Sequence, residues 1–154
     1  MNRMTMINEK VYISGQMTGL GRDEYRDRFR EAERLIRAEG YHRIVNPIRV
    51  WTCRVPWLYK AIGYKLTLLY DLWLVLRCDR IYMIPGWNDS RGAKIESFVA
   101  YNSGIRRLPQ KVKDRLDAKM EQFIGKVDDR DWERVSKVKG WRYRQKVKPN
   151  KDEG

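Results

Sequence analysis

Apolar runs of strand length alternate with helix-period segments along the first two thirds of the chain. KVYISG is typical of a buried strand that ends in a glycine, and the amphipathic segment after it stops at Gly40. Strands are expected at 10–15, 43–47 and 80–86, and helices at 22–39, 59–77 and 92–103. Strands separated by helices pair in parallel, with helices on both faces of the sheet. We therefore expect an α/β fold, a three-layer sandwich of the flavodoxin or Rossmann type.

Three segments depart from this regular strand and helix pattern. Residues 48–58 contain two tryptophans and a proline without a clear period, so we expect a loop there. The segment 59–77 is mostly apolar, which favours a largely buried helix. A sheet of this kind also needs a final strand after Gly104, but IRRLPQ is a poor strand sequence.

The α/β domain is expected to span residues 1–105, followed by a basic C-terminal helix and tail at 106–154. This second segment holds 16 Lys or Arg against 9 Asp or Glu. One helical face collects Val112, Leu116, Met120, Phe123 and Ile124, which predicts a helix that docks on the domain or on a partner subunit. From Gly125 onward, basic residues are interleaved with aromatic ones. Such a segment is either a solvated tail or a nucleic-acid-binding element.

The chain has few residues for histidine or cysteine chemistry. Its one histidine, His42, lies beside Arg43 and far from any GxSxG pattern, so we expect a surface histidine rather than a member of a catalytic triad. Cys53 and Cys78 lack the CxxC spacing of a zinc site and are not expected to form a disulfide. We expect no metal and no cofactor, and carboxylates, hydroxyls and backbone amides are left to do any chemistry.

Membrane association is not expected either. The most apolar run, 66–76, is interrupted by Asp71 and is too short to span a bilayer. The N-terminal residues lack the apolar core of a signal peptide. We therefore expect a cytoplasmic protein, and its net charge of +13 favours anionic partners or high solubility.

Ligands of parallel α/β sheets bind at the carboxyl ends of the strands. Three turns of this chain meet that edge: SGQMTGLG, NPIRVW and PGWNDSRG. Glu96 follows the third turn and lies within an apolar helical stretch, which is an unusual place for a carboxylate. It is either a functional group or a helix residue paired with Arg91 or Lys94. Asp71 is likewise either functional or an exposed helix position.

Several ordered motifs together resemble one known family. VYISGQMTG, the helix running to EGY, then VNP, then YDLWLVLRCDRIYMIPGWNDSRGAKIE and AYNSG are similar to the nucleoside 2-deoxyribosyltransferase superfamily. More narrowly, they resemble its deoxyribosyltransferase-like proteins of unknown function from phages and bacteria. This resemblance covers about residues 10–105. It implies the cytoplasm of a bacterium or of a phage-infected host.

The resemblance implies roles for individual residues. Family members cleave or exchange the N-glycosidic bond of 2′-deoxynucleosides with a glutamate nucleophile, which Glu96 matches. Tyr12 matches the tyrosine that orients this glutamate, and Asp71 matches an aspartate that contacts the base. The expected substrate-binding residues are Ser14, Gly15, Gln16, Met17, Thr18, Gly19, Asn46, Pro47, Gly86, Trp87, Ser90 and Gly92.

Ser90 separates two branches of the family. Six residues before the nucleophile, the transferases carry an acidic residue, whereas 2′-deoxynucleoside 5′-monophosphate N-glycosidases carry a serine that holds the phosphate. Gln16 and Thr18 depart from the family's phosphate loop, which has a basic residue and a serine there.

The sequence therefore predicts an N-glycosidase of deoxynucleoside monophosphates, or a deoxyribosyl transferase, acting through Glu96. A homo-oligomer, most simply a dimer, is expected because neighbouring subunits complete each site in the family. Two alternatives remain: a non-catalytic protein that binds or sequesters a nucleotide or nucleotide-derived signal, and a nucleic-acid-binding protein that uses its basic tail.

Overall fold

A parallel sheet forms the centre of the protein. The computed structural model describes residues 6–49 and 56–136, and its sheet has four strands in the order β2-β1-β3-β4. The strands are β1 (Ile7–Ser14), β2 (Tyr41–Val45), β3 (Arg80–Met83) and β4 (Arg106–Arg107), and all adjacent pairs are parallel. The chain leaves β1 toward β2 on one side and reaches β3 on the other, so the order reverses at β1. Ligands of open α/β sheets bind at such a reversal.

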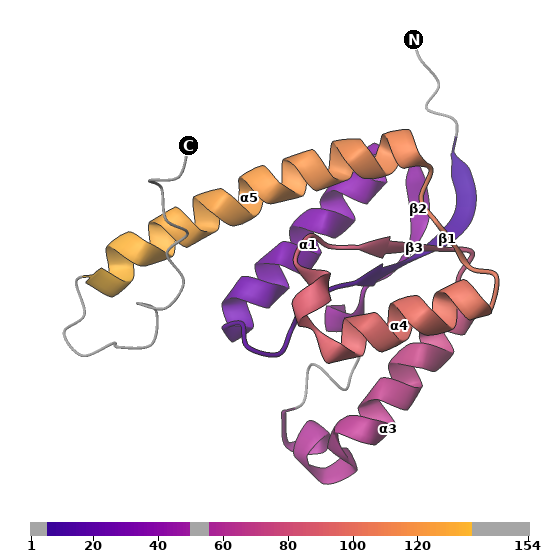
Figure 1. Ribbon diagram of the computed structural model, residues 1–154, viewed down its shortest axis with the longest axis horizontal. Coiled ribbons are helices and arrows are strands. Elements are labelled where there is room, and N and C mark those ends of the chain that lie inside the picture. Colours follow the sequence, from indigo (N-terminus) through magenta and orange to yellow (C-terminus); the bar gives the residue numbers. More distant parts are fainter. Residues whose placement is uncertain (1–5, 50–55, 137–154) are drawn as a thin grey trace.

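Helices cover both faces of this sheet (Figure 1). They are α1 (Arg22–Ala38), α3 (Pro56–Leu76), α4 (Arg91–Asn102) and α5 (Gln110–Ser136), with short 3₁₀ turns η1 (Pro47–Arg49) and η2 (Trp87–Asp89). Helices α1 and α5 pack together on one face, and α3 and α4 pack together on the other. The three-layer α/β fold expected from the sequence is confirmed.

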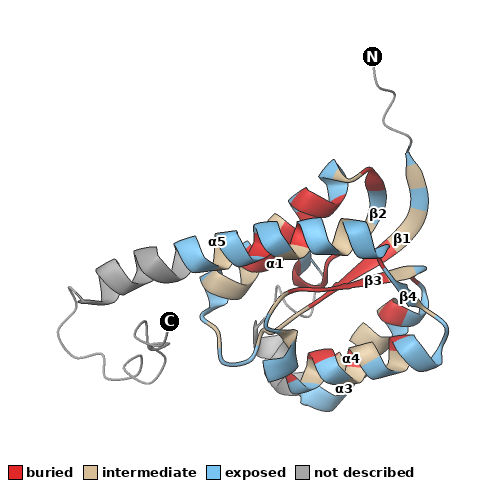
Figure 2. Cartoon of the chain, turned by 45° about the horizontal axis from the view of Figure 1, so that its top comes forward, coloured by how far each residue is buried: buried red, intermediate tan, exposed pale blue. Residues whose placement is uncertain are grey.

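Alternation along the strands divides the core into two halves. Val11 and Ile13 of β1 point toward α1 and α5, whereas Tyr12 points toward α3 and α4. All three side chains are fully buried, and Figure 2 shows the second half of β1 and most of β3 as buried, whereas the first half of β1 is partly exposed. Because successive side chains of a strand face opposite ways, every second residue of β1 lies on the α3–α4 side.

The sheet and core continue past residue 105. Strand β4 consists of two exposed arginines that pair with Arg80 and Ile81 of β3, which explains why its sequence lacks a strand pattern. Helix α5 buries Leu116 and Met120 in the same core as α1, while Val112, Phe123 and Ile124 pack around them. The expected docking of this helix on the domain is confirmed. The helix extends to Ser136, and the basic residues from 137 onward lie outside the described residues.

Helix α3 differs from its prediction. We expected a largely buried helix, but Leu66, Leu69, Trp73 and Leu76 are 47–60% exposed. The helix is apolar on two faces, and only the face that carries Thr67 and Val75 is covered. We call the four exposed residues the α3 stripe. The helix is also kinked at Gly63, and it starts at Pro56 within the segment expected to be a loop.

The histidine, the cysteines and the helices can also be compared with their expected properties. His42 is exposed, as expected, and Cys78 is a buried free thiol, whereas Cys53 lies outside the described residues. Within the described part of the chain, no group of three or more potential metal-ligating side chains is present. None of the described helices is long and apolar enough to cross a membrane.

Candidate functional site

Glu96 lies on α4 with its side chain directed at the sheet. The helix begins at Ser90, whose Oγ accepts a hydrogen bond from the Ala93 amide at 3.3 Å. Ala93, Glu96 and Ala100 are its buried residues and recur every three or four positions, so they share the face that packs on the strands. Glu96 is only 7% exposed. A carboxylate buried to this extent needs hydrogen-bond donors or a proton.

Two hydroxyl groups of β1 supply those donors. The Tyr12 hydroxyl donates to Glu96 Oε1 at 3.0 Å, and the Ser14 hydroxyl donates to Oε2. Both residues point to the α3–α4 side because they are two positions apart on the strand. No ion pair joins Glu96 to Arg91 or Lys94 among the described residues, so the salt-bridge alternative has no support. Ser14 thus holds the carboxylate of Glu96, and its expected role in substrate binding stays a prediction.

Asp71 brings a second carboxyl group into the same region. Its Oδ1 atom is buried and has no hydrogen-bond partner among the described residues. Burial raises the pKa of Asp71 to about 7. Its charge also contributes to raising the pKa of Glu96, which places the two groups within electrostatic reach of each other. Asp71 is therefore not an exposed helix position, and its functional role stays a prediction.

The surroundings of Glu96 and Asp71 affect the pKa values of their carboxyl groups in different ways. Burial, and then the charge of Asp71, raise the pKa of Glu96 to about 7, while the hydrogen bonds from Ser14 and Tyr12 lower it. Two hydroxyl donors stabilise a carboxylate, whereas a buried carboxyl without donors is more stable when protonated. Both groups therefore titrate near neutral pH, and the two hydroxyl donors favour the ionised form of Glu96.

These buried carboxyl groups make stability depend on pH. In an unfolded chain both ionise with a pKa of about 4, but in the folded protein each has a pKa of about 7. The folded state therefore keeps protons that the unfolded state has lost, and the free energy of unfolding falls as pH rises through this interval. Glu96→Gln removes one of the titrations. Its melting temperature should match wild type at about pH 4 and exceed it above about pH 7, by roughly 5 °C.

Thermal melts of both proteins between those pH values, followed by circular dichroism, measure this effect. The same difference in melting temperature at every pH would contradict the raised pKa of Glu96.

The turn after β1 is partly structural. A Cβ atom at Gly15 would lie 3.1 Å from Ile84 Cβ and 3.3 Å from Phe29 Cζ, so close packing of β1 against its neighbours explains this glycine. Gln16 Nε2 donates to the Thr18 carbonyl at 3.1 Å and closes the turn. Met17 packs on the core, while Thr18 and Gly19 are exposed. The tip of this turn is its most exposed part, and the expected role of the turn in substrate binding stays a prediction.

The turn after β2 is fixed by internal hydrogen bonds. Asn46 Nδ2 donates to Glu33 Oε2 at 2.8 Å and to the Phe29 carbonyl at 3.3 Å, and its Oδ1 accepts from the Ile48 amide at 3.2 Å. Asn46 is 3% exposed, and Pro47 is buried as well. These contacts explain both residues without a ligand, so their expected role in substrate binding stays a prediction.

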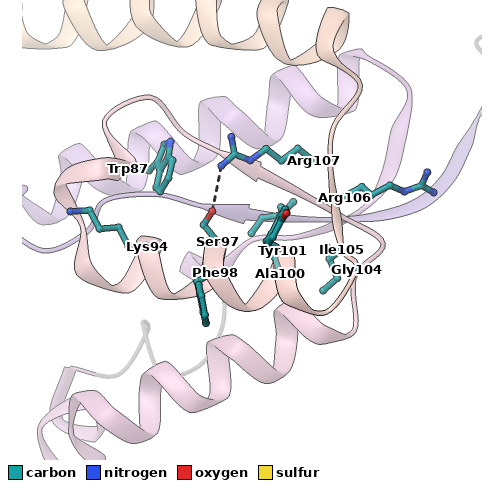
Figure 3. A pocket seen from close by; sticks show the side chains of 11 residues that line it. Trp87, Lys94, Ser97, Phe98, Ala100, Tyr101, Gly104, Ile105, Arg106 and Arg107 are labelled. Carbon is teal, nitrogen blue, oxygen red and sulfur yellow. Dashed lines mark hydrogen bonds between the residues drawn. The ribbon is translucent and has the colours of Figure 1, made fainter.

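Residues of the turn after β3 lie on two different sides of α4. Gly86 adopts a φ of 91°, which a residue with a side chain rarely does, and starts η2. Ser90 is buried and caps α4 on the Glu96 side. The Trp87 ring instead lies 5.5 Å from the guanidinium of Arg107, beside a groove between α4 and β4 (Figure 3).

One residue near this site was not anticipated from the sequence. A Cβ atom at Gly92 would lie 3.4 Å from the Tyr64 hydroxyl and 3.9 Å from Ser90 Oγ. The hydroxyl of Tyr64 is therefore close to the first turn of α4, where backbone amides favour anions. The signal was its spacing, because Tyr64 precedes Asp71 by seven residues, or two helical turns, and shares its face of α3.

The comparisons with known proteins give one match. A family model whose description is "Domain of unknown function (DUF4406)" matches residues 9–107, which is more than half of the chain. This range runs from β1 through β4, and it includes Tyr12, Asp71 and Glu96 but not α5. No curated protein and no solved structure matches the chain.

Proposed function

The chain belongs to the DUF4406 family, and we propose that it is an N-glycosidase that cleaves the base–sugar bond of 2′-deoxynucleoside 5′-monophosphates. One observation carries the proposal: a buried carboxylate, Glu96, is held by two hydroxyls while a second buried carboxyl, Asp71, lies within electrostatic reach. A pair of carboxyl groups in contrasting environments is the arrangement that glycosidic bond cleavage requires. The similarity to the deoxyribosyltransferases supports the same assignment.

The proposed reaction has two steps. Glu96 attacks the anomeric carbon of the deoxyribose, and the bond to the base breaks with its electrons moving onto the base nitrogen. Asp71 donates its proton to the departing base, so the leaving group is neutral. Water then attacks the glycosyl ester, gives a proton to Asp71 and releases the sugar phosphate together with the Glu96 carboxylate. A second base in place of water would make the protein a transferase.

Tyr12 and Ser14 fix the attacking oxygen atoms. Their hydroxyls engage one oxygen each, so the carboxylate plane cannot turn freely. The positive charge that develops on the sugar is stabilised by this oriented carboxylate. In this reaction Glu96 is the nucleophile and Asp71 supplies the proton that leaves with the base, so each of the two carboxyl groups has a chemical role.

The 5′-phosphate is assigned to the first turn of α4. Unpaired amides at a helix N-terminus attract anions, and the Ser90 hydroxyl, Gly92 and the Tyr64 hydroxyl lie around this turn. The exposed tip of the turn after β1, at Thr18 and Gly19, is at the same edge of the sheet. We place the reaction in the cytoplasm of a bacterium or a phage-infected host.

Incubation of the purified protein with each deoxynucleoside monophosphate, followed by chromatography for free base, tests the proposal. Base release from at least one of them is expected, with deoxyribose 5-phosphate as the second product. Binding of a nucleotide without base release would support the non-catalytic alternative. The nucleic-acid alternative through the basic tail concerns residues that lie largely outside the described part of the chain.

Substitutions of Ser90 should separate nucleotides from nucleosides. Ser90→Asp keeps an N-cap acceptor for the Ala93 amide but places a negative charge beside the phosphate. We expect its kcat/KM for monophosphates to fall by about tenfold or more relative to nucleosides. Ser90→Ala should weaken monophosphate use less, because it removes only the hydroxyl. Equal losses on both substrates in steady-state assays would show that Ser90 only shapes the loop.

We further propose that the protein is a homodimer in which the α3 stripe is buried. Leu66, Leu69, Trp73 and Leu76 recur at spacings of three and four residues, which is the pattern of a helix that packs on another helix. Antiparallel pairing of two copies would set Leu66 against Leu76 and Leu69 against Trp73, so the stripe is self-complementary.

Light scattering should give twice the 18.6 kDa chain mass at micromolar concentration. Leu69→Glu is expected to shift this to the monomer, because it would bury an unpaired charge. Met6→Glu, which changes an exposed apolar residue just before β1, is the matched control and should leave the mass unchanged. A wild-type monomer would rule out the dimer.

A further inference from the structure

A groove lies between α4, η2 and β4, on the side of α4 that faces away from Glu96. Its volume is about 800 Å³, and its walls include Trp87 from η2, Lys94, Ser97, Phe98 and Tyr101 from α4, and Arg107 from β4 (Figure 3). Glu96 is buried against β1, whereas its neighbour Ser97 turns to the groove. We call this the α4 groove, and the proposed N-glycosidase reaction does not use it.

The charges that line the groove are all positive. No acidic residue is among the residues of its walls, and neither Lys94 nor Arg107 forms an ion pair within the described part of the chain. Arg107 is held in place, because its Nη2 donates to Ser97 Oγ at 3.4 Å and its guanidinium lies 5.5 Å from the Trp87 ring. Arg106 also borders the groove but points away from Arg107, and it helps to lower the pKa of Glu9. Two positive charges therefore border this space, Arg107 held in place and Lys94 exposed to solvent.

Aromatic rings accompany these charges. Phe98 and Tyr101 on α4 are 70% and 83% exposed, and the Trp87 ring on η2 forms one wall of the groove. Exposed rings beside unpaired cations provide stacking surfaces for bases and counter-charges for phosphates. The combination fits a ligand that alternates planar bases with negative charge.

We propose that the α4 groove binds single-stranded nucleic acid. The high exposure of Phe98 and Tyr101 favours a strand over a free mononucleotide. A small ligand would cover only part of such an open surface, whereas a strand reaches several rings and cations at once. Duplex is disfavoured because its bases are stacked on each other and cannot stack on the rings. The net charge of +13 attracts any such polyanion.

Fluorescence anisotropy of a labelled oligothymidylate with the full-length protein tests this proposal. Tyr101→Ala should weaken binding by about tenfold, since a lost base stack is typically worth that much. Lys94→Gln should lower the slope of log K against log salt by about 0.7, which corresponds to one phosphate of a single strand. Lys111→Gln, an equally exposed lysine on α5 across the sheet, removes the same charge and should leave the affinity nearly unchanged.

Both groove residues are exposed, so the variants should fold, and melting curves check this. Wild-type affinity in both variants, or no strand binding by the wild-type protein, would overturn the proposal. Wild-type affinity in both variants would indicate that another basic segment binds the strand. If one equivalent of deoxynucleoside monophosphate displaces the strand from the wild-type protein but not from Tyr101→Ala, the groove is a mononucleotide site, and this result would overturn the proposal as well. Base release should persist in both variants, so failure here leaves the proposed glycosidase reaction untouched.

Discussion

Glu96→Gln is expected to abolish release of free base from deoxynucleoside monophosphates, with a loss of about 10⁴-fold or more in kcat. The amide keeps the shape of the side chain: its oxygen can accept a hydrogen bond from one of the two hydroxyls of Tyr12 and Ser14, and its NH2 group can donate to the other. It cannot form the glycosyl ester or stabilise the developing positive charge. Because the fold is retained and even stabilised at neutral pH, the loss would report chemistry rather than unfolding.

Two further variants make the comparison with Glu96→Gln specific. Glu121→Gln changes an exposed glutamate on α5 and should leave base release unaffected. Tyr12→Phe removes one hydrogen bond that orients the carboxylate, so a loss of about tenfold is expected, in line with roughly 1 kcal/mol for such a bond. Retention of more than a few per cent of activity in Glu96→Gln would remove Glu96 as the nucleophile.

The centre of the sheet could be predicted from the sequence because the second half of β1 and most of β3 are short buried apolar runs. Helices of clear period follow or separate these strands, and that pattern is visible without any tertiary information. β4 could not be read in this way. Its two residues are exposed arginines, and they form a strand only because β3 offers them an edge.

Burial was harder to predict than the elements. The apolar composition of α3 predicted a buried helix, yet composition does not show that only one of its faces meets the domain. The boundary predicted at residue 105 lies within two residues of the end of the family match, but β4 and α5 continue the same sheet and core. Helical period identified the apolar face of α5, and only the fold shows that this face packs on α1.

The site could be predicted only in part, because it is formed by contacts between segments that are distant in the sequence. Glu96 stood out in the sequence as a carboxylate inside an apolar stretch, whereas Tyr12 and Asp71 were selected through the family resemblance. No local pattern could show that the Ser14 hydroxyl engages Glu96, because 82 residues separate them. In the same way, Asn46 matched a family motif, but its contact with Glu33 depends on the packing of α1 beside β2.

Asp71→Asn is expected to reduce base release by about 10² to 10⁴-fold, which is the usual contribution of a general acid. Its buried Oδ1 lacks a partner among the described residues, and burial raises the pKa of Asp71 to about 7, so this group can hold a proton near neutral pH. The wild-type rate should therefore have a maximum near neutral pH. It falls at lower pH as Glu96 is protonated, and at higher pH as Asp71 loses its proton.

The pH profile distinguishes a proton donor from a structural residue. In Asp71→Asn the fall at high pH should disappear, because no carboxylic acid remains to be deprotonated. The fall at low pH should keep its position, because Asp71 is protonated and uncharged where Glu96 titrates, and the amide of Asn is uncharged as well. Asp89→Asn is the matched control, since Asp89 is exposed on η2 next to Ser90 and should keep both limbs of the profile. Loss of the high-pH limb in Asp89→Asn, with the limb intact in Asp71→Asn, would transfer the proton donor to Asp89.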